Sequence, residues 1–154
     1  KTSVLLGCAL QMGGIVGGVS TADAARLYAF GEQLGLAFQI QDDLLDLFGE
    51  SAQVGKQIGG DVLANKKTLL SISAKKAANQ SELKVLQEIE STLDPQIKVA
   101  QTQKLYTALG ARSYCESKME FHHHQALNAL EDMELTNSKE ELKELANFLF
   151  TRAY

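Results

Sequence analysis

The sequence predicts an all-α helical bundle. Long stretches of the 154 residues are rich in Ala, Leu, Glu, Lys and Gln, which are strong helix formers. The chain has one proline and no tryptophan, and 45% of its residues are hydrophobic, which is enough to build a buried core. No segment shows the alternation of polar and apolar residues that is typical of a half-buried strand. We therefore expect residues 1–154 to form a single all-helical piece.

Charge and composition narrow the classes of function. The net charge of −4 argues against a nucleic-acid partner. The apolar stretch over residues 4–19 is shorter than the ~20 residues that a transmembrane helix needs, so we expect no membrane span. Cys8 and Cys115 form no spacing motif and fit a reducing compartment, and no signal peptide is visible, which together predict a cytoplasmic protein. Because the chain starts at Lys1 and enters a helical pattern at once, we expect a piece of a longer protein.

The first two helices are predicted over residues 2–18 and from about residue 21 to Phe48. Ser20 or Thr21 is placed to cap the second helix. In the first helix, four residues share one stripe at helical spacing: Gly7, Gln11, Gly14 and Gly18. Small residues on such a stripe permit close approach by another helix or by a ligand, and both interpretations stay open here.

The segment 49–66 breaks the helical pattern with four glycines and is predicted to be a loop carrying Lys56 and Lys66. Two shorter helices are predicted over residues 67–79 and 81–92.

The last part of the chain has clear helix signals. Asp94-Pro95 is a start signal, with Asp as the N-cap and Pro at the first helical position. The helical pattern then runs to about residue 133, with an interruption allowed at Gly110. The sequence Ser138-Lys139-Glu140-Glu141 is a capping box that predicts a final helix through Phe150.

An acidic cluster lies near the end of the second predicted helix. Asp42, Asp43 and Asp46 place three carboxylates within five residues. Positions i and i+4 of an α-helix lie about 40° apart, and i+1 and i+4 about 60° apart, so the three side chains share one face. Like charges at this spacing repel by a few tenths of a kcal/mol per pair, and the negative end of the helix dipole adds to the repulsion. The cluster therefore predicts a bound cation.

Basic residues follow this cluster directly. Lys56 and Lys66 in the loop, joined by Lys1 if its helix lies alongside, are placed to meet a phosphate-bearing ligand. Mg²⁺ keeps several waters and takes one or two protein carboxylates together with substrate phosphates. The pattern predicts a Mg²⁺-bridged polyphosphate at the mouth of a helical bundle. The alternative is a solvated acidic face with ordinary surface lysines.

The residues around this pattern resemble a known family. Three segments carry the resemblance: Gly31-x-x-Leu34-Gly35-x-Ala37-Phe38-Gln39-Ile40-x-Asp42-Asp43-x-x-Asp46, Gly55-Lys56-x-x-Gly59-x-Asp61 and Asn65-Lys66-Lys67-Thr68. With Lys1-Thr2 one helix earlier, they closely resemble the trans-isoprenyl diphosphate synthases (polyprenyl synthetases) at the second aspartate-rich motif and the lysine-bearing loop after it. The resemblance implies the C-terminal portion of the terpenoid-synthase fold and Mg²⁺-dependent, head-to-tail prenyl transfer from an allylic diphosphate to isopentenyl diphosphate.

The resemblance also implies a metal site. Asp42 would ligate Mg²⁺ that bridges to the allylic diphosphate, and Asp43 and Asp46 would support it directly or through water. Ionisation of a C–O bond leaves a diphosphate anion, and metal ions and lysines stabilise that developing charge.

The resemblance further implies a set of substrate contacts. Lys1 and Lys56 would contact the diphosphate leaving group, with Lys66 as a further basic contact in the same region. Thr2 and Gln39 would line the reacting centre, where the allylic carbocation forms. Phe38 would lie near the homoallylic substrate.

The chain departs from the family in one large respect. The family has a first aspartate-rich motif upstream, with basic residues that hold isopentenyl diphosphate, and residues 1–154 contain neither. We therefore expect the C-terminal half of a farnesyl- or geranylgeranyl-type synthase, which is catalytically inactive by itself and is a homodimer when intact.

Other interpretations stay open. A non-catalytic subunit of the same fold would depend on a partner for chemistry, and a helical interaction domain would have an acidic face that is only solvated. A terpene cyclase is disfavoured, because cyclases usually carry an Asn/Ser/Glu metal motif where this chain has its aspartates. His122-His123-His124 is not predicted to be a metal site, because consecutive helix residues point about 100° apart.

Overall fold

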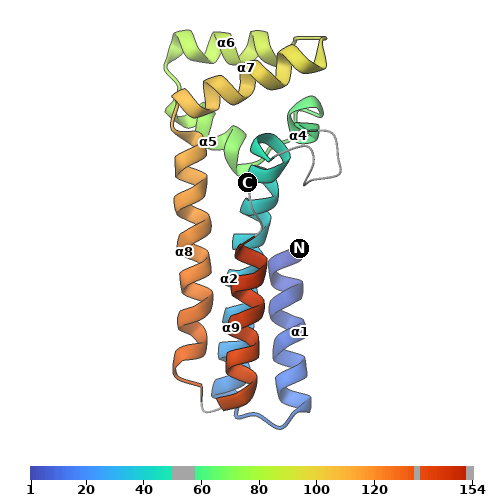
Figure 1. The fold of residues 1–154 in the computed structure, drawn as a ribbon, viewed down its shortest axis with the longest axis vertical. Coiled ribbons are helices and arrows are strands. Elements are labelled where there is room, and N and C mark those ends of the chain that lie inside the picture. The colour runs from blue at the N-terminus through green and yellow to red at the C-terminus, as the bar shows by residue number, and fades with distance from the viewer. Residues whose placement is uncertain (50–57, 134–135, 152–154) are drawn as a thin grey trace. The chain divides into compact units, whose positions relative to one another are not determined.

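The computed structural model describes residues 1–49, 58–133 and 136–151, and it describes no side chain within 134–138. Every regular element in these residues is a helix, which confirms the all-α prediction (Figure 1). The helices are α1 (Thr2–Val16), α2 (Thr21–Phe48), α4 (Gly60–Leu63), α5 (Leu69–Ala77), α6 (Gln80–Glu90), α7 (Pro95–Ala108), α8 (Ala111–Glu131) and α9 (Thr136–Phe150). Among the residues described, no helix has the length and apolar character needed to cross a membrane.

The chain gathers into two compact units. The first contains the described residues of Lys1–Gln39 and Lys118–Arg152, and the second contains those of Ile40–Ser117. Helices α2 and α8 each contribute one part to each unit. The expectation of a single domain over residues 1–154 stays a prediction.

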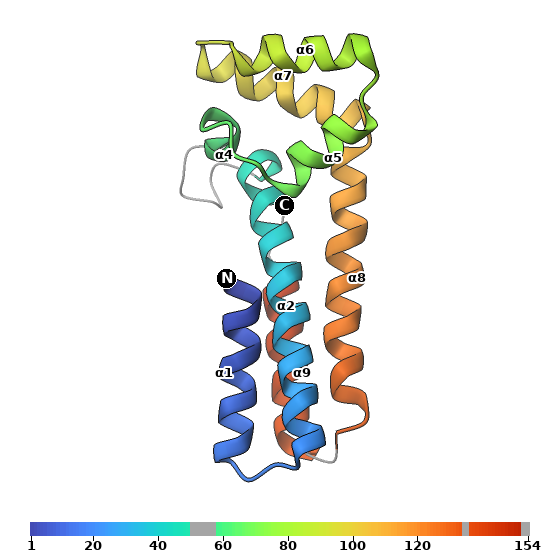
Figure 2. The same ribbon diagram turned by 180° about the vertical axis from the view of Figure 1, so that it is seen from behind.

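The first unit is a bundle made of α1, α9 and parts of α2 and α8. These segments lie side by side in both ribbon views (Figures 1 and 2). They bury a common apolar cluster: Leu27, Phe30, Leu34, Ala126, Leu130, Met133 and Ala146. The cluster gives the bundle its stability, because burial of apolar surface is the main favourable contribution to folding.

Small residues bring α1 and α2 into close contact. A methyl group on Gly31 would lie 2.9 Å from the Gly7 Cα, and one on Gly35 would lie 2.5 Å from the Ser3 Cα. Both distances are too short for a real side chain, so glycine is required at each position. Gly7 of the small-residue stripe therefore serves helix packing, together with Gly31 of the facing helix.

Several predicted helix signals are confirmed. Ser20 Oγ accepts the Asp23 N–H at 3.1 Å, and Asp94 Oδ1 accepts the Ile97 N–H at 3.0 Å, as N-cap residues do. Gly110 separates α7 from α8 with a φ of +71°. The other predicted helix ends differ from the observed ones by a residue or two, which is the usual spread of helix boundaries.

Two predictions about local structure are wrong. Helix α9 begins at Thr136, so Ser138 lies inside its first turn rather than at its cap. The segment 49–66 is not entirely a loop, because it contains the one-turn helix α4. The sequence pattern misses α4 because contacts with residues far along the chain hold this turn in place.

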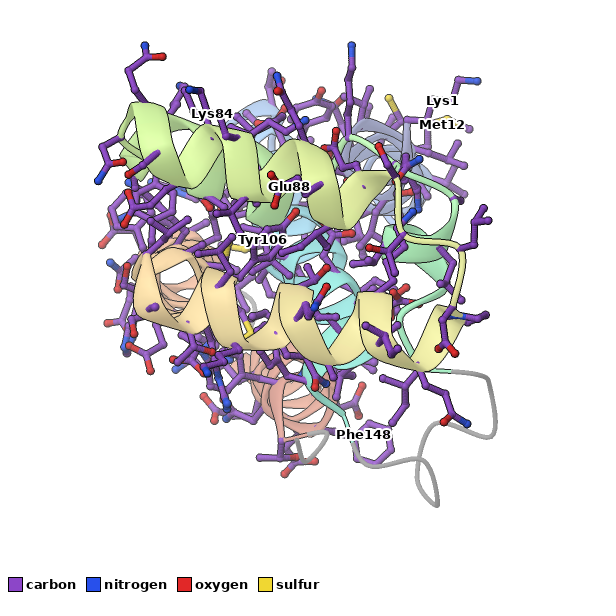
Figure 3. The ribbon with its side chains drawn as sticks, turned by 90° about the horizontal axis from the view of Figure 1, so that it is seen from above. Lys1, Met12, Lys84, Glu88, Tyr106 and Phe148 are labelled. Carbon is purple, nitrogen blue, oxygen red and sulfur yellow. The ribbon has the colours of Figure 1, made fainter. Side chains whose placement is uncertain are left out.

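The second unit contains the end of α2, the start of α8, and α4 to α7. Figure 3 shows α6 and α7 lying side by side, with Tyr106 between them. Helix α4 packs on α7 through Gly59, whose φ is +79° and where a methyl group would lie 2.4 Å from Val99 Cγ2. Glycine is required at this position both by the backbone and by the neighbouring side chain.

Gly35→Ala tests the close packing of α1 on α2. The added methyl group would lie 2.5 Å from the Ser3 Cα, so we expect the free energy of unfolding to fall by about 1–3 kcal/mol. Gly13→Ala is the matched control: a methyl group there meets nothing within 4 Å, and stability should rise by up to about 1 kcal/mol. Chemical denaturation measures both values, and similar effects of the two substitutions would contradict the close contact.

Gly59→Ala tests the packing of α4 on α7. Gly18 has the same φ of +79° with nothing within 4 Å, so Gly18→Ala carries only backbone strain, about 1–2 kcal/mol. We expect Gly59→Ala to lower the free energy of unfolding by about 1–3 kcal/mol more than Gly18→Ala does, because it also clashes with Val99. Adding Val99→Ala should recover part of this excess. Equal losses at the two glycines, measured by denaturation, would argue against the contact.

Candidate functional site

The site is built on the last turns of α2, where the acidic cluster lies. Asp42 is exposed, whereas Asp43 and Asp46 are half-buried. Asp46 Oδ2 accepts the backbone N–H of Asp61 at 3.0 Å, and Asp43 Oδ2 accepts the backbone N–H of Leu69 at 3.4 Å. Asp61 lies in the first turn of α4, and Leu69 is the first residue of α5. Two of the three carboxylates therefore hold the starts of α4 and α5.

Asp61 holds the side chain of Lys66 near the acidic cluster. Lys66 Nζ lies 2.9 and 3.1 Å from the two carboxylate oxygens of Asp61. The Lys66 side chain remains 61% exposed, and the Asp61 side chain is 23% exposed. Lys66 is therefore fixed near Asp43 and Asp46 and is still open to solvent.

The electrostatics of the cluster favour an added positive charge. Burial raises the pKa of the Asp43 and Asp46 carboxyls, and the nearby Asp61 charge adds to this effect. Backbone N–H donors and the Lys66 charge lower both pKa values, but not enough to cancel the rise. The hydrogen bond and the charge of Asp61 raise the pKa of Lys66, so this lysine stays a cation. A bound cation would stabilise the ionised carboxylates further.

A cavity of about 150 Å³ lies beside the cluster. Its lining includes Asp43, Asp46, Asp61 and Lys66, but not Asp42. Sequence reasoning assigned no role to several other polar residues of the lining: Asn65, Lys67, Thr68, Lys75, Glu90, Lys98 and Thr102. One signal was available for Lys98, because this lysine stands between apolar residues in the first turns of a predicted helix.

The donor set suits Mg²⁺ as one partner of a shared site. Within the described residues, no group of three or more His, Cys, Asp or Glu side chains is arranged to hold a metal ion by itself. Mg²⁺ does not need such a cage, because it binds through one or two carboxylates, several waters and substrate phosphates. Asp42, Asp43 and Asp46 supply carboxylate oxygens of the required kind beside the cationic Lys66.

The other predicted site residues are not tested by this geometry. Lys1, Thr2 and Gln39 are exposed and Phe38 is half-buried, all within the first unit. Lys56 lies outside the described residues. The roles of these five residues stay predictions.

The three consecutive histidines form no common site. His123 is buried and stacks on Phe150 with ring centroids 4.0 Å apart, while His124 is exposed. His122 Nδ1 lies 2.8 Å from Gln33 Oε1. The three side chains thus have different surroundings, as their helical spacing predicts.

Comparisons with known proteins identify the family of the chain. The family model for polyprenyl synthetase matches residues 1–109. The short chain isoprenyl diphosphate synthase of Methanothermobacter thermautotrophicus is 32% identical over 154 residues, which are 100% of this chain and 47% of that protein. The chain therefore spans about half the length of this relative.

Two solved structures share the fold. Geranylgeranyl pyrophosphate synthetase from Pyrococcus horikoshii matches with a TM-score of 0.91 at 27% identity, over 99% of this chain and 46% of that one. Polyprenyl synthase from Caulobacter crescentus, crystallised with calcium and isoprenyl diphosphate, matches with a TM-score of 0.86 at 28% identity, over 99% of this chain and 47% of that one. The family model, the identity over the whole chain and the shared all-α fold agree, and the chain belongs to the polyprenyl synthetase family.

Proposed function

We propose that the protein carrying this chain is a prenyltransferase of isoprenoid biosynthesis. It condenses an allylic diphosphate with isopentenyl diphosphate, head to tail, and releases diphosphate. The observation that carries the proposal is the Lys66–Asp61–Asp46 arrangement, which sets a solvent-open cation beside half-buried carboxylates. Two findings support the substrate class: the family of the chain, and a relative crystallised with calcium and isoprenyl diphosphate.

In this proposal the end of α2 and the turn after α4 bind the leaving group. Asp42, Asp43 and Asp46 would hold Mg²⁺, and the bound ion would supply positive charge that stabilises the diphosphate leaving group. Lys66 donates from Nζ to the same diphosphate and shares its charge in the transition state. Its exposed side chain and its fixed position beside Asp61 support this role.

The remaining residues take the roles that the family resemblance implies. Lys1 and Lys56 contact the diphosphate, Thr2 and Gln39 line the reacting centre, and Phe38 lies near isopentenyl diphosphate. Apolar helix faces around the reacting carbon exclude water from the carbocation. The two free cysteines of the chain fit the cytoplasm, which we propose as the location of the enzyme.

Residues 1–154 supply only part of this machinery. They contain one aspartate-rich run of the DDxxD type, and the chain spans about half the length of its relatives. We propose that the rest of the metal site and the basic contacts to isopentenyl diphosphate come from other residues of a homodimeric enzyme. Residues 1–154 alone should therefore give no prenyl product from the two substrates in an assay with radiolabelled isopentenyl diphosphate, and elongated product would contradict this expectation.

Asp46→Asn and Lys66→Met test the site directly. In the protein that carries this chain, we expect each substitution to weaken Mg²⁺-dependent binding of inorganic pyrophosphate about 10- to 100-fold, because each removes a charged ligand or donor. Isothermal titration calorimetry with and without Mg²⁺ measures this affinity.

Glu88→Gln and Lys84→Met are the matched controls for these charge changes. Both residues are exposed on α6, where Figure 3 labels them. The controls should bind pyrophosphate as the wild type does. If the site variants bind as tightly as the controls, the acidic face is only solvated and the proposed function is wrong.

A further inference from the structure

We infer that Lys98 of α7 is a positioning residue, which fixes the turn that carries Lys66 to the acidic cluster. This inference rests on the proposed function, because it assigns Lys98 a part in forming the diphosphate site. Lys98 acts through Asn65 and the backbone around it, and the proposal gives Lys98 itself no contact with substrate.

Lys98 is a buried lysine whose amine binds two neutral acceptors. The residue is 5% exposed, and its Nζ donates to Asn65 Oδ1 at 2.8 Å and to the Glu90 backbone carbonyl at 2.9 Å. A buried ammonium is costly unless its donors are satisfied. Within the part of the chain that the structure describes, no carboxylate forms an ion pair with Lys98. Its charge instead meets the last carbonyl of α6, at the end of the helix dipole that favours a cation.

Asn65 has an unusual backbone conformation. Its φ is +49°, and it is the one non-glycine residue with a positive φ among those described. Asparagine tolerates this conformation better than most residues, but it is still not the preferred one. The hydrogen bond from Lys98 holds the Asn65 side chain across a separation of 33 residues in the sequence. A contact between segments so far apart explains how the unusual turn is kept in place.

The turn at Asn65 directs Lys66 toward the acidic cluster. The Asn65 N–H donates to the Val62 carbonyl at 3.0 Å, and the Lys66 N–H donates to the Asp61 carbonyl at 2.9 Å. The chain thus folds back on α4, so that Lys66 Nζ reaches the Asp61 carboxylate. The same residue, Asp61, donates its N–H to Asp46. A continuous set of contacts therefore runs from Lys98 to the carboxylates of α2.

Helix α7 holds both ends of this short segment. Lys98 binds Asn65 just after α4, and the next residue, Val99, packs against Gly59 just before it. Ordering a mobile backbone segment when a ligand binds costs conformational entropy, in addition to the rotamer entropy of a lysine such as Lys66 that the segment carries. Fixing the backbone on both sides of α4 removes part of that cost before the ligand arrives, which is pre-organisation of the site.

Amide hydrogen exchange tests the positioning role without any ligand. We expect Lys98→Met to speed exchange at the amides of residues 61–66, which the turn protects, while Lys104→Met changes none of them. Lys104 is the control because it is an exposed lysine of the same helix. Faster exchange spread evenly over α6 and α7 would mean that Lys98 only stabilises the unit, and unchanged exchange would mean that it does not hold the turn. Either result would overturn the inference.

A double-mutant cycle tests whether Lys98 acts through Asn65. Asn65→Gly keeps a residue that accepts a positive φ but removes the partner of Lys98. We expect Lys98→Met and Asn65→Gly each to weaken Mg²⁺-dependent pyrophosphate binding about tenfold, which is typical for residues that orient a metal or ligand site. The double variant should bind no more weakly than either single variant. Additive losses would show that Lys98 contacts the ligand or acts elsewhere, and would contradict the inference.

The two proposals fail in different ways. If the wild-type protein does not bind pyrophosphate with Mg²⁺, the proposed function is wrong and the role of Lys98 in that site is lost with it. If the wild type binds but the cycle is additive or the exchange is unchanged, the function stands and the inference about Lys98 is wrong.

Discussion

The structure around the candidate site depends on two carboxylates that act as backbone acceptors. Asp46 binds the N–H of Asp61, and Asp43 binds the N–H of Leu69. These bonds hold α4 and α5 at the end of α2, and the position of Lys66 follows from the position of α4. If Asp46 faced only solvent, α4 would lose one of the contacts that hold it at the end of α2, and Lys66 would be held less firmly beside the acidic cluster.

The same carboxylates make the site electrostatically unfavourable when no ligand is bound. Burial and the Asp61 charge raise the pKa of Asp43 and Asp46, so their ionised forms are less stable here than in water. Carboxyl groups with raised pKa values are typical of functional sites. A site whose charges were already neutralised by its own residues would gain little free energy from binding a cation. The half-buried carboxylates and the open Lys66 side chain are the arrangement that the proposed site for a metal ion and a diphosphate requires.

The helix ends and the acidic cluster could be predicted from the sequence, because they depend on residues that are close together in the chain. Ser20, Asp94 and Gly110 mark helix ends through interactions within a few residues, so the local sequence is sufficient to find them. Asp42, Asp43 and Asp46 stand out because like charges share one helix face. The capping-box sequence that begins at Ser138 predicts a helix start two residues too late, because α9 begins at Thr136.

The features that sequence reasoning missed depend on contacts between distant segments. Lys98 meets Asn65 across 33 residues, and Gly59 meets Val99 of the same helix α7. The apolar neighbours of Lys98 in the sequence indicate burial, but no local pattern shows which face of α7 lies against α4, so the contact of Lys98 with Asn65 could not be predicted. Gly7 and Gly31 likewise became packing residues only when the contact between α1 and α2 was known.

The proposed function requires Asp42, Asp43 and Asp46 at the end of α2 to hold a metal ion together with a diphosphate. Carbon-13 NMR of aspartate carboxyl groups, in protein labelled at those carbons and titrated with Mg²⁺ and pyrophosphate, detects such binding residue by residue. The resonances of Asp42, Asp43 and Asp46 should shift only when both ligands are present, while those of Asp23 and Asp94, at the starts of α2 and α7, should stay unchanged. If pyrophosphate binds and the resonances of Asp42, Asp43 and Asp46 stay in place, these carboxylates do not form the site.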